Sequence, residues 1–315
     1  MYDAIHGQVL QAVSGDQLIL VLAGKDPNAV SSQRRLALSS VRAPRLGNAK
    51  RGVPEEPGAW SAKIRLAKLT VGKQATVSVD YERVIGEESV SFCTVTVGGK
   101  NVAEQLAGEG LVTVVRHRDD EARAAAYDAL LAAESRAKAA KKGLFSPSLS
   151  LHPRVDFSET PAKAKTNLHF LRSAGKCRGF IDYVFSPTHF ILWVPAENCV
   201  FSMSLQGLQN LQDETATMAT RAKLLQREVS LVVSAVDRGG SFLGDFWLDG
   251  GKESVATTLL REGVTRVNET AIGFCADAKQ LLAAEAAARA GKRGLWAKLA
   301  AEEAARVGTC AGAER

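Results

Sequence analysis

Alternating hydrophobic and polar residues predict short strands at the start of both halves of the chain. In the first half, residues 7–13 and 17–22 alternate on either side of Ser14-Gly15-Asp16, which is typical of a β-hairpin. The second half opens in the same way, with strands expected over 177–185 and 190–194 about the turn Ser186-Pro187-Thr188. Each pair is followed by a third strand, a helix and another strand pair, expected over 34–41, 59–69, 76–80 and 90–97, and over 199–205, 215–225, 228–236 and 242–248.

Each half ends in two expected helices, and these helices carry a repeated sequence. Residues 102–114 align with 255–267, and the Leu-Leu-Ala-Ala-Glu of residues 130–134 recurs at 281–285. The repeat indicates two homologous domains of about 150 residues. The four helices are expected over 102–109, 120–142, 255–262 and 276–293, and they are followed by Gly110, Gly143, Gly263 and Gly294.

Five short strands with inserted and appended helices favour an α+β fold. In it each unit is a five-stranded barrel of the OB type. The two units are expected over residues 1–146 and 167–299. The proline-bearing segment 147–166 has no clear periodicity and is interpreted as a linker, and residues 300–315 as a tail.

Composition limits the class of protein but does not name an activity. The 315 residues are 46% hydrophobic and 23% charged, which is ordinary for a globular chain. The net charge of +6 permits a polyanionic partner without requiring one. Five widely spaced cysteines without a CxxC pair favour reduced thiols over a zinc or disulfide framework. No secretory signal and no run of about 18 apolar residues is present, so no membrane partner is expected.

Several stretches of the chain resemble the Tudor staphylococcal nuclease (Tudor-SN) family. The stretch Leu38-Ser-Ser-Val-Arg-Ala-Pro-Arg45 is similar to a Ser-Ser-Ile-Arg-x-Pro-Arg loop of that family. Further stretches resemble two successive internal nuclease repeats of the family, namely 110–120 with 127–134, and 225–229 with 240–244. The resemblance covers residues 5–299. It implies the third and fourth nuclease-like repeats of a longer Tudor-SN chain.

The resemblance implies functions that composition does not. They are RNA binding, a role in small-RNA silencing complexes such as RISC, transcript stability, transcriptional co-activation and endonuclease activity on structured RNA. The implied partners are structured or double-stranded RNA, small RNA and the proteins of ribonucleoprotein complexes. The implied location is the cytoplasm, with the nucleus as a second compartment.

The catalytic residues of this fold are largely missing from the chain. Nucleases of the fold hold Ca²⁺ with carboxylates and neutralise the phosphate with arginines. Carried over position by position, the first-turn aspartate is Asp16, but the Asp-Thr-Pro-Glu motif falls on Arg42-Ala43-Pro44-Arg45 in the first unit. In the second unit the motif is placed at Leu205-Gln206-Gly207-Leu208, and the first turn has no aspartate. We therefore expect no metal site or cofactor, and interpret Asp16 as a turn residue. Ca²⁺ is expected only if the chain proves to be a nuclease.

Basic residues stand where the nucleases keep their carboxylates. Between residues 34 and 51 there are six Lys or Arg residues and no acid. Because guanidinium groups match phosphate oxygens in a bidentate manner, this segment is expected to contact RNA, the alternative being a solvated basic loop. Arg116 and Arg118 are further candidates, although Asp119 and Asp120 balance part of their charge. The expected RNA-binding residues are Arg34, Arg35, Arg42, Arg45, Lys50, Arg51, Arg116 and Arg118.

Residues that could suggest other chemistry are expected to be structural. His117 has no Ser/His/Asp or Cys/His constellation around it in the sequence and is interpreted as an exposed structural histidine. The residues expected in the core are Cys93, Cys275, Trp193, Trp247 and Trp296.

Three functions remain open at this point. An RNA-binding scaffold is favoured, because the basic residues replace the catalytic acids. The first alternative is a metal-dependent endoribonuclease acting on structured or double-stranded RNA. The second is a protein–protein interaction module with no RNA affinity.

Overall fold

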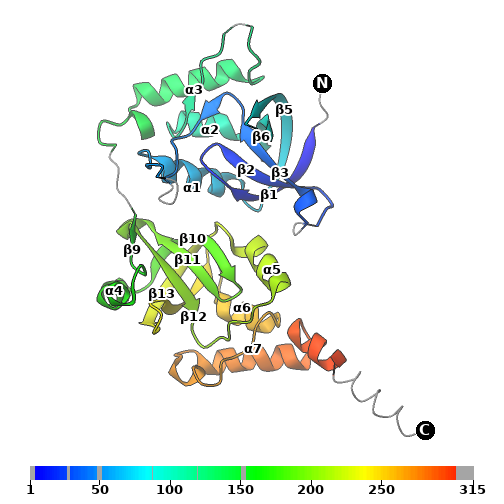
Figure 1. Cartoon of the computed structure of the whole chain (residues 1–315), viewed down its shortest axis with the longest axis vertical. Helices are drawn as coiled ribbons and strands as arrows, with labels where there is room; N and C mark the ends of the chain where they lie inside the picture. Colours follow the sequence, from blue (N-terminus) through cyan, green and yellow to red (C-terminus); the bar gives the residue numbers. More distant parts are fainter. Residues whose placement is uncertain are drawn as a thin grey trace, which may run out of the picture. The chain divides into compact units, whose positions relative to one another are not determined.

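The computed structural model describes residues 4–26, 29–47, 52–86, 88–118, 120–149 and 154–302 of the chain (Figure 1). The chain divides into two compact units, unit one over Met1–Pro153 and unit two over Arg154–Arg315. Within the described residues, no helix is long and apolar enough to cross a membrane. Lys50 and Arg51, and the tail beyond residue 302, lie outside the described residues.

Unit one is built on a five-stranded closed barrel, as the alternation predicts. The strands run in the order β3-β2-β1-β5-β6, and a parallel pairing of β3 with β6 closes the sheet on itself. Alternate residues of β2, such as Leu18 and Leu20, are fully buried inside the barrel. The strands are β1 (Ile5–Ala12), β2 (Gln17–Leu22), β3 (Gln33–Leu38), β5 (Gln74–Ile85) and β6 (Glu88–Val97).

Helices and short strands surround this barrel. A two-stranded ladder of β4 (Val41–Arg42) with β8 (Thr113–Val114) joins the segment after β3 to the segment after α2. The side chain of Asn101 caps α2 by accepting hydrogen bonds from the N–H groups of Ala103 and Glu104. The remaining elements are η1 (Val30–Ser32), α1 (Ala59–Thr70), β7 (Lys100–Asn101), α2 (Val102–Gly108), α3 (Tyr127–Ala139) and η3 (Gly143–Phe145).

Unit two repeats this architecture. Its barrel has the strand order β11-β10-β13-β14-β12 and closes through β11 and β12. Four phenylalanines, Phe190, Phe201, Phe242 and Phe246, fill the barrel and stack in edge-to-face pairs. The strands are β10 (Cys177–Ser186), β11 (His189–Val194), β12 (Cys199–Leu205), β13 (Glu228–Val236) and β14 (Phe242–Leu248). The other elements are β9 (Val155–Asp156), α4 (Pro161–Ser173), η4 (Pro195–Glu197), α5 (Glu214–Leu224), α6 (Val255–Arg261), η5 (Ile272–Phe274) and α7 (Ala278–Ala290).

The glycines of the repeated sequence touch each other. Gly110 has φ of +70°, and a Cβ there would lie 2.4 Å from the carbonyl oxygen of Lys142. A Cβ on Gly143 would lie 2.3 Å from the carbonyl oxygen of Gly110, which also accepts the N–H of Leu144 at 2.7 Å. Both glycines are therefore required by close backbone approach as well as by conformation. The corresponding pair in unit two is Gly263 and Gly294.

Among the predicted boundaries that differ from the structure, two concern the long helix of unit one and the linker. The long helix expected from Asp120 begins at Tyr127, because the segment before it is bonded to the barrel instead. The N–H of Ala124 donates to Ser40 Oγ at 2.8 Å, and that of Ala125 to Asp80 Oδ1 at 3.3 Å.

The second difference concerns the expected linker over residues 147–166. Within it, β9 pairs with β12 of unit two, and α4 begins at Pro161 with Thr160 as its cap. The units divide between residues 153 and 154, so the C-terminal part of the expected linker belongs to unit two. The two-residue strand β9 and the cap of α4 are too short to produce a periodic pattern in the sequence, so this segment was interpreted as a linker.

Candidate nucleic-acid interface

The first turn of unit one is fastened to the loop after β4 by Asp16. One carboxylate oxygen of Asp16 accepts the N–H of Ala43 at 3.0 Å, and the other accepts the hydroxyl of Ser14 at 2.6 Å. The carbonyl oxygen of Asp16 accepts the N–H of Leu38 at 2.8 Å. Asp16 and the Arg42–Arg45 loop are thus neighbours, but the carboxylate is engaged in holding the loop.

The two serines before Arg42 are structural. Ser39 and Ser40 are buried, and Ser40 adopts a φ of +57°. Ser39 Oγ bonds to Asp80, and the N–H of Ser40 donates to the hydroxyl of Tyr81 at 3.2 Å. The N–H of Val115 donates to the carbonyl of Ser40 at 2.9 Å. These bonds fix the segment so that Val41 points inward and Arg42 outward.

Arg42 and Arg45 differ in how they are held. Arg45 forms an ion pair with Glu56 at 2.9 Å, and its N–H donates to the same carboxylate at 2.8 Å. The backbone N–H and then the guanidinium of Arg45 hold the pKa of Glu56 below its usual range, with a smaller contribution from the charge of Arg42. Arg42 is exposed and forms no ion pair with any described residue. Its guanidinium is therefore available to a phosphate.

A buried carboxylate positions Arg116 beside this loop. Glu134 of α3 has a side chain only 2% exposed, and it accepts the N–H of Val114 at 2.9 Å. Its other oxygen contacts Arg116 Nη2 at 2.6 Å and Lys138 Nζ at 2.9 Å. Burial acts to raise the pKa of Glu134, but the bonds from Val114, Lys138 and Arg116 outweigh it and lower that pKa. Arg116 is held at one edge while its side chain stays 58% exposed.

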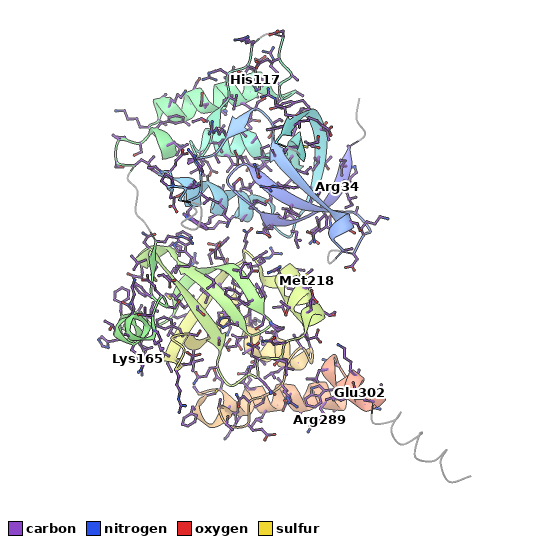
Figure 2. All side chains as sticks on the ribbon, in the orientation of Figure 1. Arg34, His117, Lys165, Met218, Arg289 and Glu302 are labelled. Atoms are coloured by element: carbon purple, nitrogen blue, oxygen red, sulfur yellow. The ribbon has the colours of Figure 1, made fainter. Side chains whose placement is uncertain are left out.

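The structure divides the expected basic residues into separate groups. Arg34 and Arg35 lie at the start of β3, opposite Leu20 and Ile19 of β2, whereas Gln17, which follows Asp16, pairs with Ala37. Figure 2 shows Arg34 well away from His117, which precedes α3. Arg35 bonds to Gln17 at 2.7 Å. Arg42 and Arg45 flank Ala43 at the Asp16 end, whereas Arg116 and Arg118 follow β8 as exposed side chains.

The expected motif loop of unit two is displaced by four residues. Leu205 donates its N–H to Thr188, as Leu38 does to Asp16, so these leucines correspond. The bridge of Leu208 with Val267 likewise matches the pair of Val41 with Val114. The counterparts of residues 42–45 are therefore 209–212, which read Gln-Asn-Leu-Gln. Sequence comparison misplaced these four residues because the alignment of the two units is fixed by the bridge of Leu208 with Val267, which local sequence patterns do not show.

Neither unit brings metal-ligating groups together. No cluster of three or more His, Cys, Asp or Glu residues suited to a metal occurs in the part of the chain that the structure describes. In unit two the Asp16 position is Thr188, whose hydroxyl donates to Asn210 at 3.3 Å. The donor set at both sites does not fit a Ca²⁺ ion, since that ion needs several carboxylate or carbonyl oxygens.

The expectation of an exposed His117 is wrong. Its side chain is 1% exposed and lies between the rings of Tyr81 and Tyr127, in edge-on contact with both. The hydroxyl of Tyr127 accepts the N–H of His117 and donates to the carbonyl of Val115, which draws the segment against the barrel. His117 therefore packs as an aromatic residue and does not face the basic surface.

The residues expected in the core are less uniform than predicted. Cys93 and Trp296 are buried, and burial raises the pKa of the Cys93 thiol to about 12. Cys275, Trp193 and Trp247 are only partly buried. Sequence reasoning also missed the role of Glu134, although its recurrence in the repeated Leu-Leu-Ala-Ala-Glu was a signal. In unit two the same position, Glu285, accepts the N–H of Val267 at 2.8 Å.

Comparison with known proteins agrees with this architecture. The sequence matches the family described as "Staphylococcal nuclease homologue" over residues 35–147 and 209–298, one stretch in each unit. The chain therefore belongs to the staphylococcal nuclease family, as two tandem repeats of the fold.

The curated relatives that match are Tudor-SN proteins. The chain is 34% identical to "Ribonuclease TUDOR 2" of Arabidopsis thaliana, over 93% of this chain and 34% of the relative. It is 30% identical to "Staphylococcal nuclease domain-containing protein 1" of Drosophila melanogaster, over 81% of this chain and 30% of the relative. The chain thus spans about a third of the length of the curated relatives it matches.

Proposed function

We propose that this chain is an RNA-binding and scaffolding module of a Tudor-SN protein, corresponding to its third and fourth nuclease-like repeats. The observation that carries the proposal is the site in unit one. There Arg42 and Arg45 flank Ala43, whose N–H is bonded to Asp16, Arg116 follows the strand that pairs with Val41–Arg42, and no cluster of acids is present among the described residues to hold a metal. Exposed guanidinium groups on a rigid loop bind phosphates without cleaving them.

The expected ligand is structured or double-stranded RNA, recognised through its backbone. Arg42 and Arg118 are exposed and unpaired among the described residues, whereas Arg45 and Arg116 are anchored by carboxylates. Anchoring reduces the conformational entropy lost on binding, since one edge of each guanidinium is already fixed. The same proposal includes small RNA and ribonucleoprotein proteins as partners, a role in RNA silencing, transcript stability and co-activation, and a cytoplasmic and nuclear location.

A titration with duplex RNA tests the proposal. Arg42→Glu is expected to weaken binding and to reduce the dependence of affinity on salt, because one phosphate contact and its released counterion are lost. Adding Arg45→Glu should weaken binding further. Lys165→Glu is the matched control, since Lys165 is an exposed lysine on α4 of unit two (Figure 2). Equal affinity and salt slope in Arg42→Glu and the control would contradict the assignment.

The same protein and RNA also distinguish RNA binding from the alternative function, endoribonuclease activity. Two of the relatives are named "Ribonuclease TUDOR", which is why RNA cleavage has to be tested as an alternative function. We expect intact RNA after incubation with Ca²⁺, because Asp16 is engaged by Ala43 and Ser14 and has no carboxylate neighbours at the motif positions. Cleavage that EDTA abolishes, and that Asp16→Asn removes, would favour the nuclease instead. Absence of RNA binding at low salt would favour a protein-interaction module.

A further inference from the structure

The two units carry opposite charges at one equivalent position. The bridge of Leu208 with Val267 corresponds to the pair of Val41 with Val114, so Gln209 stands where unit one has Arg42. Counting onward from the two valines, Glu269 stands where unit one has Arg116. The site in unit one that holds exposed arginines therefore has a counterpart in unit two with a different chemistry.

The glutamate behind this position is buried and paired with cations in unit one, whereas in unit two it is only partly buried and pairs with no cation among the described residues. Glu134 has three partners, the N–H of Val114 and the cations of Arg116 and Lys138. Its counterpart Glu285 keeps only the backbone bond, to Val267 at 2.8 Å. In place of the arginine there is a second acid, and no cation among the described residues pairs with either carboxylate.

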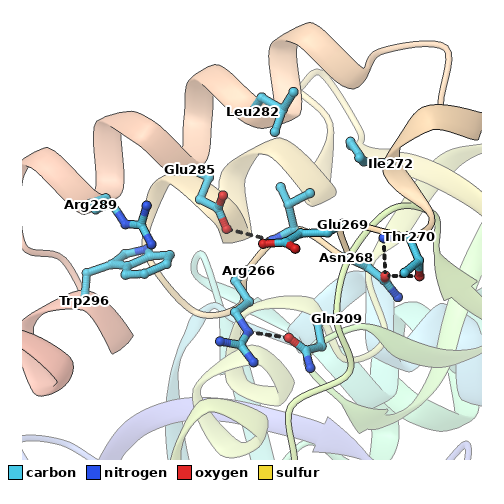
Figure 3. Close-up of a pocket in the computed structure, with 11 residues that line it drawn as sticks. Gln209, Arg266, Asn268, Glu269, Thr270, Ile272, Leu282, Glu285, Arg289 and Trp296 are labelled. Carbon is cyan, nitrogen blue, oxygen red and sulfur yellow. Dashed lines mark hydrogen bonds between the residues drawn. The ribbon is translucent and has the colours of Figure 1, made fainter.

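The arginine best placed to form an ion pair with Glu285 contacts another residue instead. Arg289 occupies the position of Lys138 in the repeat, one helical turn beyond Glu285, but its guanidinium lies 4.4 Å from the centre of the Trp296 ring. Figure 3 shows Arg289 against Trp296, while the dashed line from Glu285 runs to the backbone. The second nearby cation, Arg266, bonds to Gln209. Both arginines are thus committed to other groups.

A hollow of about 500 Å³ opens where unit one has the Arg116 side chain. Its lining includes Glu269, Glu285 and Trp296 together with the two engaged arginines, Arg266 and Arg289, and Ile272 and Leu282 supply apolar surface (Figure 3). Trp296 is 8% exposed, and its indole Nε1 is buried without a hydrogen-bond partner in the described structure. Because Trp296 lines the hollow, its indole N–H signal is sensitive to an occupant.

We propose that this hollow binds the arginine side chain of a partner protein, which takes the place that Arg116 fills within unit one. The guanidinium pairs with the carboxylates of Glu269 and Glu285, and its methylene stem packs on the apolar lining. An anionic ligand such as a phosphate is disfavoured, because both acids face it and the two arginines are already engaged.

The indole N–H signal of Trp296 in an amide-correlation NMR spectrum reports on the hollow directly. The chain has four tryptophans, and Trp296→Phe assigns the signal. The probe is the peptide acetyl-Gly-Arg-Gly-amide, compared with the same peptide carrying citrulline, the neutral analogue of arginine. We expect the arginine peptide to shift the signal in a saturable way and the citrulline peptide to bind at least about tenfold more weakly.

Three variants separate the proposal from a general charge effect. Glu285→Gln should weaken the peptide about tenfold while keeping an acceptor for Val267. Glu269→Arg copies unit one, so its own guanidinium should fill the hollow and abolish the shift in a folded protein. Glu269→Gln, which removes the charge without filling the space, should weaken binding without abolishing it. Equal binding of both peptides, an unchanged shift in Glu269→Arg, or a shift caused by inorganic phosphate instead would overturn the proposal.

Discussion

The same substitution should have different costs in the two repeats. Glu134→Gln removes the charge that faces Arg116 and Lys138, whereas Glu285→Gln removes no ion pair from unit two. Arg116 and Lys138 are both about half exposed, so solvent screening limits each pair to at most about 1 kcal/mol. We therefore expect Glu134→Gln to cost about 1–2 kcal/mol of unfolding free energy and Glu285→Gln less than about 0.5 kcal/mol.

Hydrogen exchange measured by mass spectrometry along a urea series follows each unit separately. A loss of about 1–2 kcal/mol corresponds to a fall of the unit-one midpoint by roughly 0.5–1 M urea. The reference is Glu285→Gln, in which glutamine still accepts the Val267 N–H. Equal costs in the two units would refute the argument that Arg116 and Lys138 stabilise unit one through this carboxylate.

The pH dependence of that difference gives a second check. Burial alone would raise the pKa of Glu134, but its hydrogen bonds and cations lower it overall. A carboxyl with a lowered folded-state pKa stabilises the fold fully above its unfolded pKa, which is about 4.3 for glutamate. That stabilisation is lost as the pH falls through the folded-state pKa. The difference between the wild-type chain and Glu134→Gln should therefore disappear in acid, and a difference independent of pH would contradict the assignment.

Two further predictions concern the repeat glycines and a buried acid. Gly110→Ala should destabilise unit one by more than about 2 kcal/mol, since its Cβ meets a carbonyl oxygen at 2.4 Å. Gly98→Ala, also at positive φ but in open space, should cost only about 1 kcal/mol in the same denaturation assay. Burial raises the pKa of Asp245 to about 6, so its contribution to stability falls as the pH rises from about 4 to above 6. Asp245→Asn should therefore gain stability over wild type by about 2 kcal/mol at neutral pH but not at pH 4, and parallel pH profiles would rule this out.

The barrels were predictable from the sequence because their signals are local. Alternation marks each strand, and Gly110 marks the end of its helix, so the elements fall close to their predicted bounds. The segment before Tyr127 looked helical because it is rich in alanine. Its backbone is instead bonded to Ser40 and Asp80, residues far away in the chain. Such long-range bonds leave no periodic pattern.

The candidate site was predictable in its residue types but not in its grouping. The loop that carries Arg42 and Arg45 is bonded to Asp16 through the N–H of Ala43, and the binding of RNA by these arginines stays a prediction. The arginines of β3 were grouped with them only because they are near in sequence. The burial of His117 depends on Tyr81 and Tyr127, two rings that come from different elements. The sequence alone could not show that the arginines of β3 lie apart from Arg42 and Arg45, or that His117 is buried. Both features depend on how β2, β3 and β8 pair with other strands.

The repeats can change charge at this site without losing their fold. Glu134 and Glu285 each hold a strand residue that precedes them, Val114 or Val267, through an N–H bond that does not involve the side chain at the variable position. That position is exposed in both units, as Arg116 in one and Glu269 in the other. Because exposed substitutions cost little when the backbone is held independently, the same scaffold can present a cation in one unit and an anion in the other. The tandem therefore presents an arginine at this position in unit one and a glutamate in unit two, and this difference in charge is what the proposed binding of RNA by one unit and of a basic protein segment by the other requires.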